Sequence, residues 1–481
     1  MTHFGTKFRG SRRDFFSRLG DGVHGAALAW LLQKDLPGSP GPGHGRPRID
    51  LTPQAPHREP KAKSVIHLFM NGGPSQVDLF DHKPTLARMA GGAAPRDLLN
   101  QIENMDQVGT LMPSYWEFSR HGKCGMELSE LLPHTATIVD DITLVRSMYS
   151  EHFNHEPAIN LFHTGRTITG RPTMGAWVTY ALGTENQNLP GYVVLEDTNL
   201  PVNGIQNWQA GWLPPTYQGT RFREKDPAVL NLNPRERLPN PLIEAERSLL
   251  RSLDHSHRME RPWQPDLAAR ISSYELAARM QLAASDALDL SQESEATKEM
   301  YGLNNEATAS YGRRCLLARR LVERGVRFVQ IFIEYQIWDN HHSLKEKLEY
   351  CCRKTDQPSA ALVRDLKQRG LLDDTLVVWG GEFGRMPIPQ VRDGGAAGRD
   401  HGPDGFSLWM AGGGVKAGYV HGATDDIGHK AAVDRVSVHD FHATFLHLLG
   451  LNHRDLVFRR HGLEERLTDQ YPARLVHEIL A

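Results

Sequence analysis

The sequence has few cysteines, no excess of either charge and no long hydrophobic run, and each absence excludes a class of protein. Four cysteines in 481 residues, none in a Cys-x-x-Cys pair, are too few for a disulfide framework and form no zinc-ribbon or redox motif. Lys and Arg number 55 against 57 Asp and Glu, so no nucleic-acid partner is expected. No stretch reaches the roughly 20 apolar residues of a membrane span. These absences leave a globular protein whose stability depends on its hydrophobic core.

The first residues contain an arginine pair, Arg12-Arg13, followed by an apolar stretch over residues 23–32. This pattern is typical of a twin-arginine export signal, so we expect residues 1–35 to be a signal and the protein to be periplasmic or extracellular. An ordinary amphipathic helix is the alternative, because the stretch lacks an A-x-A cleavage site and contains His24. Residues 36–63 are rich in Pro, Gly, Arg and His and predict a linker.

Short apolar runs alternate with helical patterns over much of residues 64–453. These patterns predict a helix at 360–369 and strands at 64–70, 142–145, 192–195, 326–333, 376–379 and 406–410. The alternation predicts an α/β fold with a mainly parallel sheet flanked by helices. It lapses over about 199–319, where helical patterns lie near 242–253 and 267–290. We interpret this region as a partly helical insertion that caps the site, and residues 454–481 as a C-terminal tail.

Polar residues beside the predicted strand ends are the candidate functional groups, because ligands of open α/β sheets bind beyond the carboxyl ends of the strands. Four of them are carboxylates or imidazoles: Asp339, His341, Glu382 and His401. Such groups, converging from different elements, bind divalent metal ions. The four residues therefore predict a site for zinc, calcium or magnesium. Each also has an ordinary alternative, such as a capping Asp in a solvated loop or an internal pair of Glu382 with Arg385.

Four segments carry a family resemblance: Asn71-Gly72-Gly73-Pro74-Ser75-Gln76-Val77-Asp78, Trp338-Asp339-x-His341, Gly381-Glu382-Phe383-Gly384-Arg385 and Gly398-Arg399-Asp400-His401. In this order they resemble the alkaline phosphatase and sulfatase superfamily and, within it, the sulfatase-like domain-of-unknown-function family 1501. The resemblance runs from about residue 64 to 453 and implies an alkaline phosphatase-like fold. It places Asp339, His341, Glu382 and His401 at metal-binding positions. It also implies an anionic ester or sulfated glycan as substrate, for which Asn71, Ser75 and Arg385 are the candidate binding residues.

The chain departs from the sulfatase pattern at the nucleophile. Sulfatases carry a Cys/Ser-x-Pro/Ala-x-Arg site, which is missing at all four cysteines. The segment over residues 161–166 resembles the end of the sulfatase nucleophile segment and places His155 at the nucleophile position, where it is the candidate catalytic residue. His155 follows Asn154, so it would lie at a helix N-terminus, where an anion is stabilised. It could bind metal, accept a phosphoryl group or only cap the helix. Phe383 stands where a second metal ligand is usual.

Three function classes fit these observations. The first is an exported metal-dependent hydrolase of sulfate or phosphate esters that needs no formylglycine. The second is a catalytically degenerate binder of sulfated or phosphorylated glycans, and the third is a scaffold partner of other exported proteins. Fold alone does not choose among them, and the sequence indicates no oligomeric state. The metal-type residues favour the hydrolase.

We expect export to depend on the arginine pair. Replacing both residues, Arg12→Lys and Arg13→Lys, should retain the protein in the cytoplasm, because a twin-arginine signal is read through this pair. Cell fractionation and immunoblotting measure the distribution. The linker variant Arg46→Lys with Arg48→Lys is the matched control and should be exported normally. Unchanged export of the Arg12/Arg13 variant would show that the pair is an ordinary surface feature.

Overall fold

The computed structural model describes residues 50–99, 109–223, 227–229, 239–261, 264–391 and 396–481. The predicted signal, residues 1–35, and residues 36–49 of the predicted linker lie outside them. The chain divides into two compact units. The smaller unit includes Leu238–Ile271, and the larger unit includes Asp50–Arg237 and Ser272–Ala481.

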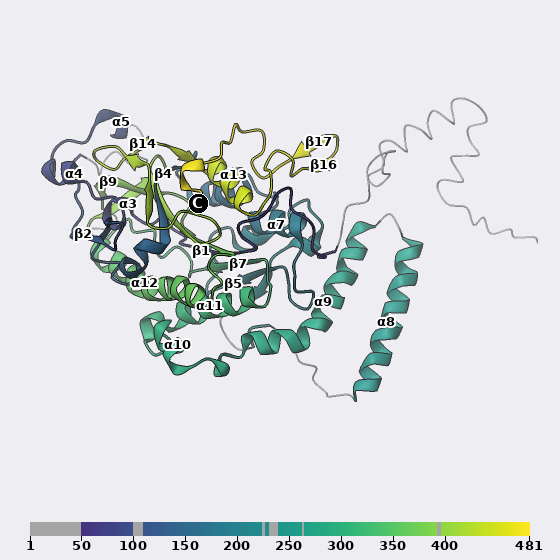
Figure 1. The fold of residues 1–481 in the computed structure, drawn as a ribbon. Helices are drawn as coiled ribbons and strands as arrows, with labels where there is room; N and C mark the ends of the chain where they lie inside the picture. Colours follow the sequence, from purple (N-terminus) through teal and green to yellow (C-terminus); the bar gives the residue numbers. More distant parts are fainter. Residues whose placement is uncertain (1–49, 100–108, 224–226, 230–238, 262–263, 392–395) are drawn as a thin grey trace, which may run out of the picture. The chain divides into compact units, whose positions relative to one another are not determined.

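A nine-stranded sheet is the centre of the larger unit within the described residues, with the order β12-β4-β11-β8-β1-β7-β5-β6 and β15 paired to β4. Figure 1 labels four strands of this sheet: β4, β1, β7 and β5. The pairings are parallel except those of β11, which runs antiparallel to β4 and β8. The strands are β1 Ser64–Phe69, β4 Ile142–Tyr149, β5 Tyr192–Leu195, β6 Thr220–Phe222, β7 Phe328–Phe332, β8 Thr375–Gly380, β11 Phe406–Ala411, β12 Tyr419–His421 and β15 Val436–Ser437. All six predicted strands are present, and the predicted α/β fold with a mainly parallel sheet is confirmed.

Helices cover both faces of the sheet, because the strands are apolar on both sides. In β1, Ile66 and Leu68 join the core cluster that contains residues of α11 and α12, whereas Val65 and Phe69 join the cluster that contains residues of α6, α7 and α13. Figure 1 shows α11 and α12 on one side and α7 and α13 on the other. The helices on the two faces are α6 His155–Thr164, α7 Met174–Leu182, α11 Glu306–Glu323, α12 Leu344–Gln368 and α13 Val438–Leu448. The predicted helix at 360–369 is the last part of α12.

The region predicted as an insertion contains the two long helices α8 (Asn240–Glu260) and α9 (Pro265–Leu288), followed by α10 (Glu295–Met300). The later part of this region belongs to the core, since Cys315 and Leu316 of α11 lie in the same apolar cluster as Val329 of β7. The sequence therefore predicts the long helices correctly. The capping of the site by this region stays a prediction.

The remaining described elements are short: α3 Gln76–Leu79, α4 Pro84–Arg88, α5 Arg96–Leu99, β2 Phe118–His121, β3 Met126–Ser129, β9 Gly384–Gln390, β10 Gly398–Gly402, β13 Ala423–Thr424, β14 Ala431–Val433, β16 Phe458–Arg460 and β17 Leu463–Glu465. Residues beyond 453 also reach the core, where Leu467, Val476 and Ile479 are buried. None of the helices in the described ranges combines the length and apolar character needed to cross a membrane.

Three histidines are buried on the α6 and α13 side of the sheet: His67 in β1, His163 in α6 and His442 in α13. Gln330 Nε2 lies 3.1 Å from His163 Nε2 and 3.4 Å from His67 Nδ1. His442 Nε2 donates to the carbonyl of Phe162 at 2.7 Å. Burial lowers the pKa of His163 and that of His442 to about 3. These imidazoles are therefore neutral in the folded protein at neutral and mildly acidic pH.

The buried histidines should make the protein acid-sensitive. Below the unfolded pKa of about 6.5 the unfolded chain takes up protons that folded His163 and His442 do not, so each lowers the free energy of unfolding by about 1.4 kcal/mol per pH unit. In His442→Gln, the stability lost between about pH 7.5 and 5 should be smaller by roughly 2 kcal/mol. Urea denaturation at both pH values measures this loss. The exposed His134→Gln is the control, and an unchanged loss in His442→Gln would contradict the prediction.

Candidate metal centre

Three parallel strands bring their loops to the same edge of the sheet. Phe69, the last residue of β1, pairs with Phe332 of β7 and with Gly380 of β8. The loops that leave these three strands contain Asn71, Asp339 with His341, and Glu382, respectively. Residues separated by hundreds of positions in the chain therefore lie together beyond the carboxyl ends of the strands, as the α/β pattern predicts.

His155 is the first residue of α6, which follows β4. Asn154 occupies the predicted N-cap position in an extended conformation, but its side chain makes no capping hydrogen bond. The backbone prediction for this helix start is therefore confirmed, whereas the helix N-terminus is not capped by the asparagine side chain.

His401 comes from a hairpin that the sequence did not predict. It lies in β10, paired with Arg385 of β9, in a two-stranded antiparallel sheet. Two prolines in β9, Pro387 and Pro389, argue against a strand, which explains the omission. The hairpin packs closely on the β7 loop, because a Cβ on Gly398 would lie 2.1 Å from the carbonyl carbon of His341. This contact holds β10 beside the residues that follow β7.

Four side chains direct possible ligand atoms to one point: His155, Asp339, His341 and His401. These atoms all lie within 4.8 Å of one another. Asp339 Oδ1 is 2.8 Å from His341 Nε2 and 3.3 Å from Nε2 of both His155 and His401. The Nε2 atoms of His341 and His401 are 2.9 Å apart. The three histidines are buried, and Asp339 is partly buried.

The geometry of these atoms fits a divalent cation. Tetrahedral zinc with bonds of about 2.0–2.1 Å keeps its ligand atoms roughly 3.3 Å apart. Four of the six separations in the cluster are 2.8–3.3 Å, and all lie within 4.8 Å. Nε2 of His341 and Nε2 of His401 face each other across 2.9 Å. If both nitrogens are unprotonated, neither offers a proton to the lone pair of the other. A cation between them would use both lone pairs.

The other ring nitrogens of two histidines are held by supporting side chains. His155 Nδ1 donates to Glu382 Oε1 at 2.7 Å, and Glu382, which is fully buried, also accepts from the Gly72 backbone N–H at 2.9 Å. His341 Nδ1 donates to Gln390 Oε1. Such contacts fix the tautomer that presents Nε2 to a metal, the usual arrangement around metal-binding histidines.

The ionised carboxylate of Asp339 is the group in the cluster whose charge suits a cation. Burial opposes ionisation of Asp339, but the charge of Arg385 and hydrogen bonds from the histidines outweigh it and hold its pKa well below the usual range. Burial, with the charges of Arg385 and His155, lowers the pKa of His401 well below its ordinary value. Burial would also lower the pKa of His155, yet its bonds to Asp339 and Glu382 raise it to about 9. Without a metal, the cluster thus combines an ionised carboxylate and a neutral His401 with a protonated His155, which would release its Nε2 proton when it binds a cation.

Arg385 contributes to the cluster through Asp339, to which its Nη2 donates at 2.6 Å. The buried guanidinium also donates to backbone carbonyls: to Gly73 at 3.0 Å, to Arg399 at 3.2 Å, to Trp338 at 3.3 Å and to Gly72. It therefore connects the loops after β1 and β7 to the β9–β10 hairpin. Protein acceptors surround the guanidinium that the sequence suggested for substrate binding.

Ser75 lies in a separate buried network. Its Oγ donates to Asp78 Oδ2 at 2.6 Å, and Asp78 forms a two-hydrogen-bond ion pair with Arg399 at 2.6 and 3.0 Å. Arg399 also donates to the carbonyls of Met112 and Pro113. Substrate binding by Ser75 stays a prediction, and the structure gives this hydroxyl a partner inside the protein.

Asn71 and Trp338 carry buried polar atoms that find no hydrogen-bond partner among the described residues: both side-chain amide atoms of Asn71 and Nε1 of Trp338. Asn71 is fully buried, and its backbone carbonyl accepts from the Trp338 N–H at 3.4 Å. Asn71 precedes Gly72, whose N–H binds Glu382. Unpaired buried donors are costly, so the Asn71 amide favours a polar ligand beside the centre. The indole ring of Trp338 instead packs edge-on against Trp379 in the apolar core.

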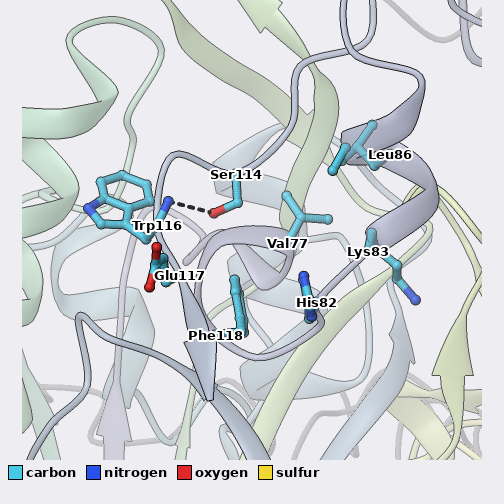
Figure 2. A pocket seen from close by; sticks show the side chains of 9 residues that line it. Val77, His82, Lys83, Leu86, Ser114, Trp116, Glu117 and Phe118 are labelled. Atoms are coloured by element: carbon cyan, nitrogen blue, oxygen red, sulfur yellow. Dashed lines mark hydrogen bonds between the residues drawn. The ribbon is translucent and has the colours of Figure 1, made fainter.

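A cavity of about 340 Å³ lies elsewhere, beside α4 and β2 (Figure 2). His82 and Phe118 stack with ring centroids 4.9 Å apart, and the Trp116 N–H donates to Ser114 Oγ at 3.3 Å. No member of the metal cluster lines this cavity.

The structure brings Asp339, His341, Glu382 and His401 together, as expected from the sequence, but Glu382 is not one of the four converging ligand residues. It binds Nδ1 of His155, and the imidazole of His155 directs its Nε2 into the cluster instead. Sequence reasoning missed Gln390, the partner of His341, for which no motif gave a signal.

These features define an α/β protein with a candidate metal centre at the carboxyl edge of a mainly parallel sheet. The family model for the protein of unknown function DUF1501 matches residues 62–480. The chain belongs to this family, which confirms the resemblance to family 1501 seen in the sequence.

Solved structures with low sequence identity are also similar to this chain. The PsFucS1 sulfatase from Pseudoalteromonas sp. has 12% identity and a TM-score of 0.35, covering 81% of this chain and 68% of that one. The phosphonate monoester hydrolase SpPMH from Silicibacter pomeroyi has 11% identity and a TM-score of 0.31, covering 88% and 76%. A TAB5 alkaline phosphatase mutant with bound Mg has 11% identity and a TM-score of 0.29, covering 73% and 92%. A comparison with curated proteins finds no match.

We expect Glu382→Gln to weaken metal binding without abolishing it. Loss of a carboxylate that supports a ligating histidine lowers metal affinity by about 10- to 100-fold. Zinc titration against a competing chelator measures the change. Glu334→Gln, which removes a carboxylate bound to Lys354 and Tyr350, is the control and should keep wild-type affinity. If Glu382→Gln lost zinc as completely as His401→Ala, Glu382 would itself be a ligand.

Proposed function

We propose that the protein is an exported, metal-dependent hydrolase of sulfate or phosphate esters. The observation that carries this proposal is the convergence of three imidazole nitrogens and one carboxylate oxygen within 4.8 Å, at the sheet edge where α/β proteins bind ligands. His155, Asp339, His341 and His401 would hold the cation. The arginine pair of the N-terminal segment supports export.

Zinc suits the proposed ligands better than calcium or magnesium. Calcium and magnesium prefer all-oxygen surroundings, whereas zinc binds imidazole and carboxylate together in fourfold coordination. Four protein ligands would fill a tetrahedral zinc, so hydrolysis would require one of them to leave or the coordination to expand to five. A divalent cation held in that way would polarise the ester and activate the attacking water. A formylglycine is then not required, in agreement with the missing Cys/Ser-x-Pro/Ala-x-Arg site.

The protein's own residues would orient the reacting groups. Glu382 holds the imidazole of His155 through the 2.7 Å bond to Nδ1, and Arg385 fixes the carboxylate of Asp339. The unpaired side-chain amide of Asn71 would donate to an ester oxygen. This donor would favour the transition state if that oxygen carries more negative charge there than in the bound substrate.

Binding of an anionic ester without turnover is the second candidate. Two observations favour it: the guanidinium of Arg385 is surrounded by protein acceptors, and His155, at the nucleophile position, is drawn into the metal cluster. A site without a nucleophilic side chain hydrolyses an ester only if the cation supplies the attacking group. The two candidates therefore differ in whether the metal-loaded protein turns over esters.

We expect metal-loaded protein to hydrolyse an aryl sulfate or aryl phosphate and chelator-treated protein to be inactive. His401→Ala should lose both metal and turnover, since it removes a proposed ligand. Asn71→Ala should keep the metal, while turnover falls by about 10²-fold because an oxyanion donor is lost. Elemental analysis and chromogenic assays on the same samples measure both quantities.

Asn186→Ala, which removes an amide bound to the carbonyl of Arg324 outside the metal cluster, makes the same chemical change as Asn71→Ala and should retain turnover. Full hydrolysis by metal-stripped protein would contradict the proposed mechanism. Binding of these esters by inactive metal-loaded protein would support the second candidate.

A further inference from the structure

Among the described residues, helix α8 carries an exposed apolar face. Four large apolar side chains on this face are 52–62% exposed: Leu242, Leu249, Leu250 and Leu253. Every described side chain of α8 is exposed or only half-buried. Helices in proteins gain most of their stability by packing an apolar face, and contiguous exposed apolar side chains mark interaction surfaces. The face therefore points to a partner.

The centre of this face has a symmetric pattern. Glu246, Leu250, Leu253 and His257 follow one another at intervals of four, three and four residues, so they form one stripe along the helix. The sequence of the stripe, acid-leucine-leucine-histidine, places complementary groups at its two ends. Reversing its direction exchanges Glu246 with His257 and Leu250 with Leu253.

We propose that α8 pairs antiparallel with α8 of a second copy of this chain. About a twofold axis, Leu250 then lies opposite the partner's Leu253, and Glu246 lies opposite the partner's His257. Each contact occurs twice, as twofold symmetry requires. A parallel pair would instead place Glu246 against the partner's Glu246, which is unfavourable. Avoidance of this contact between like charges thus selects the antiparallel arrangement.

The charge of α8 disfavours a membrane surface as the occupant. Helices that lie on membranes are rich in Lys and Arg on the polar face. In α8 four carboxylates, Glu244, Glu246, Asp254 and Glu260, balance three arginines, and Glu246 lies within the apolar stripe itself. A second copy offers this carboxylate a partner, whereas a lipid surface does not.

Light scattering coupled to size exclusion, on the full chain over a range of concentrations, tests the pairing. Wild-type protein should be a dimer. His257→Glu places Glu opposite the partner's Glu246 and should raise the dissociation constant at least about tenfold. The double variant Glu246→Lys with His257→Glu restores opposite charges and should restore the dimer. This rescue would not follow from a merely structural loss in the helix.

Matched controls lie on the opposite face of the same helix. Glu244→Lys and His255→Glu make the same chemical changes away from the stripe and should leave the dimer intact. A monomer at all concentrations, a dimer unaffected by His257→Glu, or a failure of the double variant to restore the dimer would each overturn the proposal. None of these variants touches the candidate metal centre, so hydrolytic activity reports separately on the proposed function.

Discussion

The candidate site depends on the contacts that the carboxylate of Asp339 makes. Its Oδ1 lies within 3.3 Å of three imidazole nitrogens and 2.6 Å from the guanidinium of Arg385. A partly buried charge must be compensated, so the elements that carry these groups have to converge. A Cβ on Gly72, which has a φ of 113°, would lie 2.5 Å from the Asp339 backbone nitrogen, so the β1 loop approaches only because a glycine is there. The Gly72 N–H then reaches Glu382, which holds His155.

Much of the fold could be predicted because the strands are short, apolar and separated by helical patterns. Their order in the sheet could not be read from the sequence, although parallel pairing was expected from the alternation. The convergence of Asp339, His341 and Glu382 was predictable for the same reason, since parallel strands direct their carboxyl ends to one edge. His401 was identified from its motif and not from a predicted strand, because the prolines in β9 argue against a strand there.

The relative positions of His155 and Glu382 could not be predicted. A motif identifies which residue follows a strand, but not whether its side chain faces the centre or supports a neighbour. That choice depends on the position of α6, which brings His155 Nδ1 to within 2.7 Å of Glu382. The result has a chemical consequence, because an imidazole in place of a carboxylate gives a nitrogen-rich ligand set that favours zinc over calcium or magnesium.

X-ray absorption at the zinc edge is the sharpest test of the candidate metal centre, because it identifies the atoms around the metal whether or not a substrate is known. We expect one zinc per chain, coordinated by three imidazole nitrogens and one carboxylate oxygen, with one imidazole fewer in His155→Gln. Sulfur ligands, an all-oxygen shell or protein that binds no stoichiometric zinc would contradict this expectation.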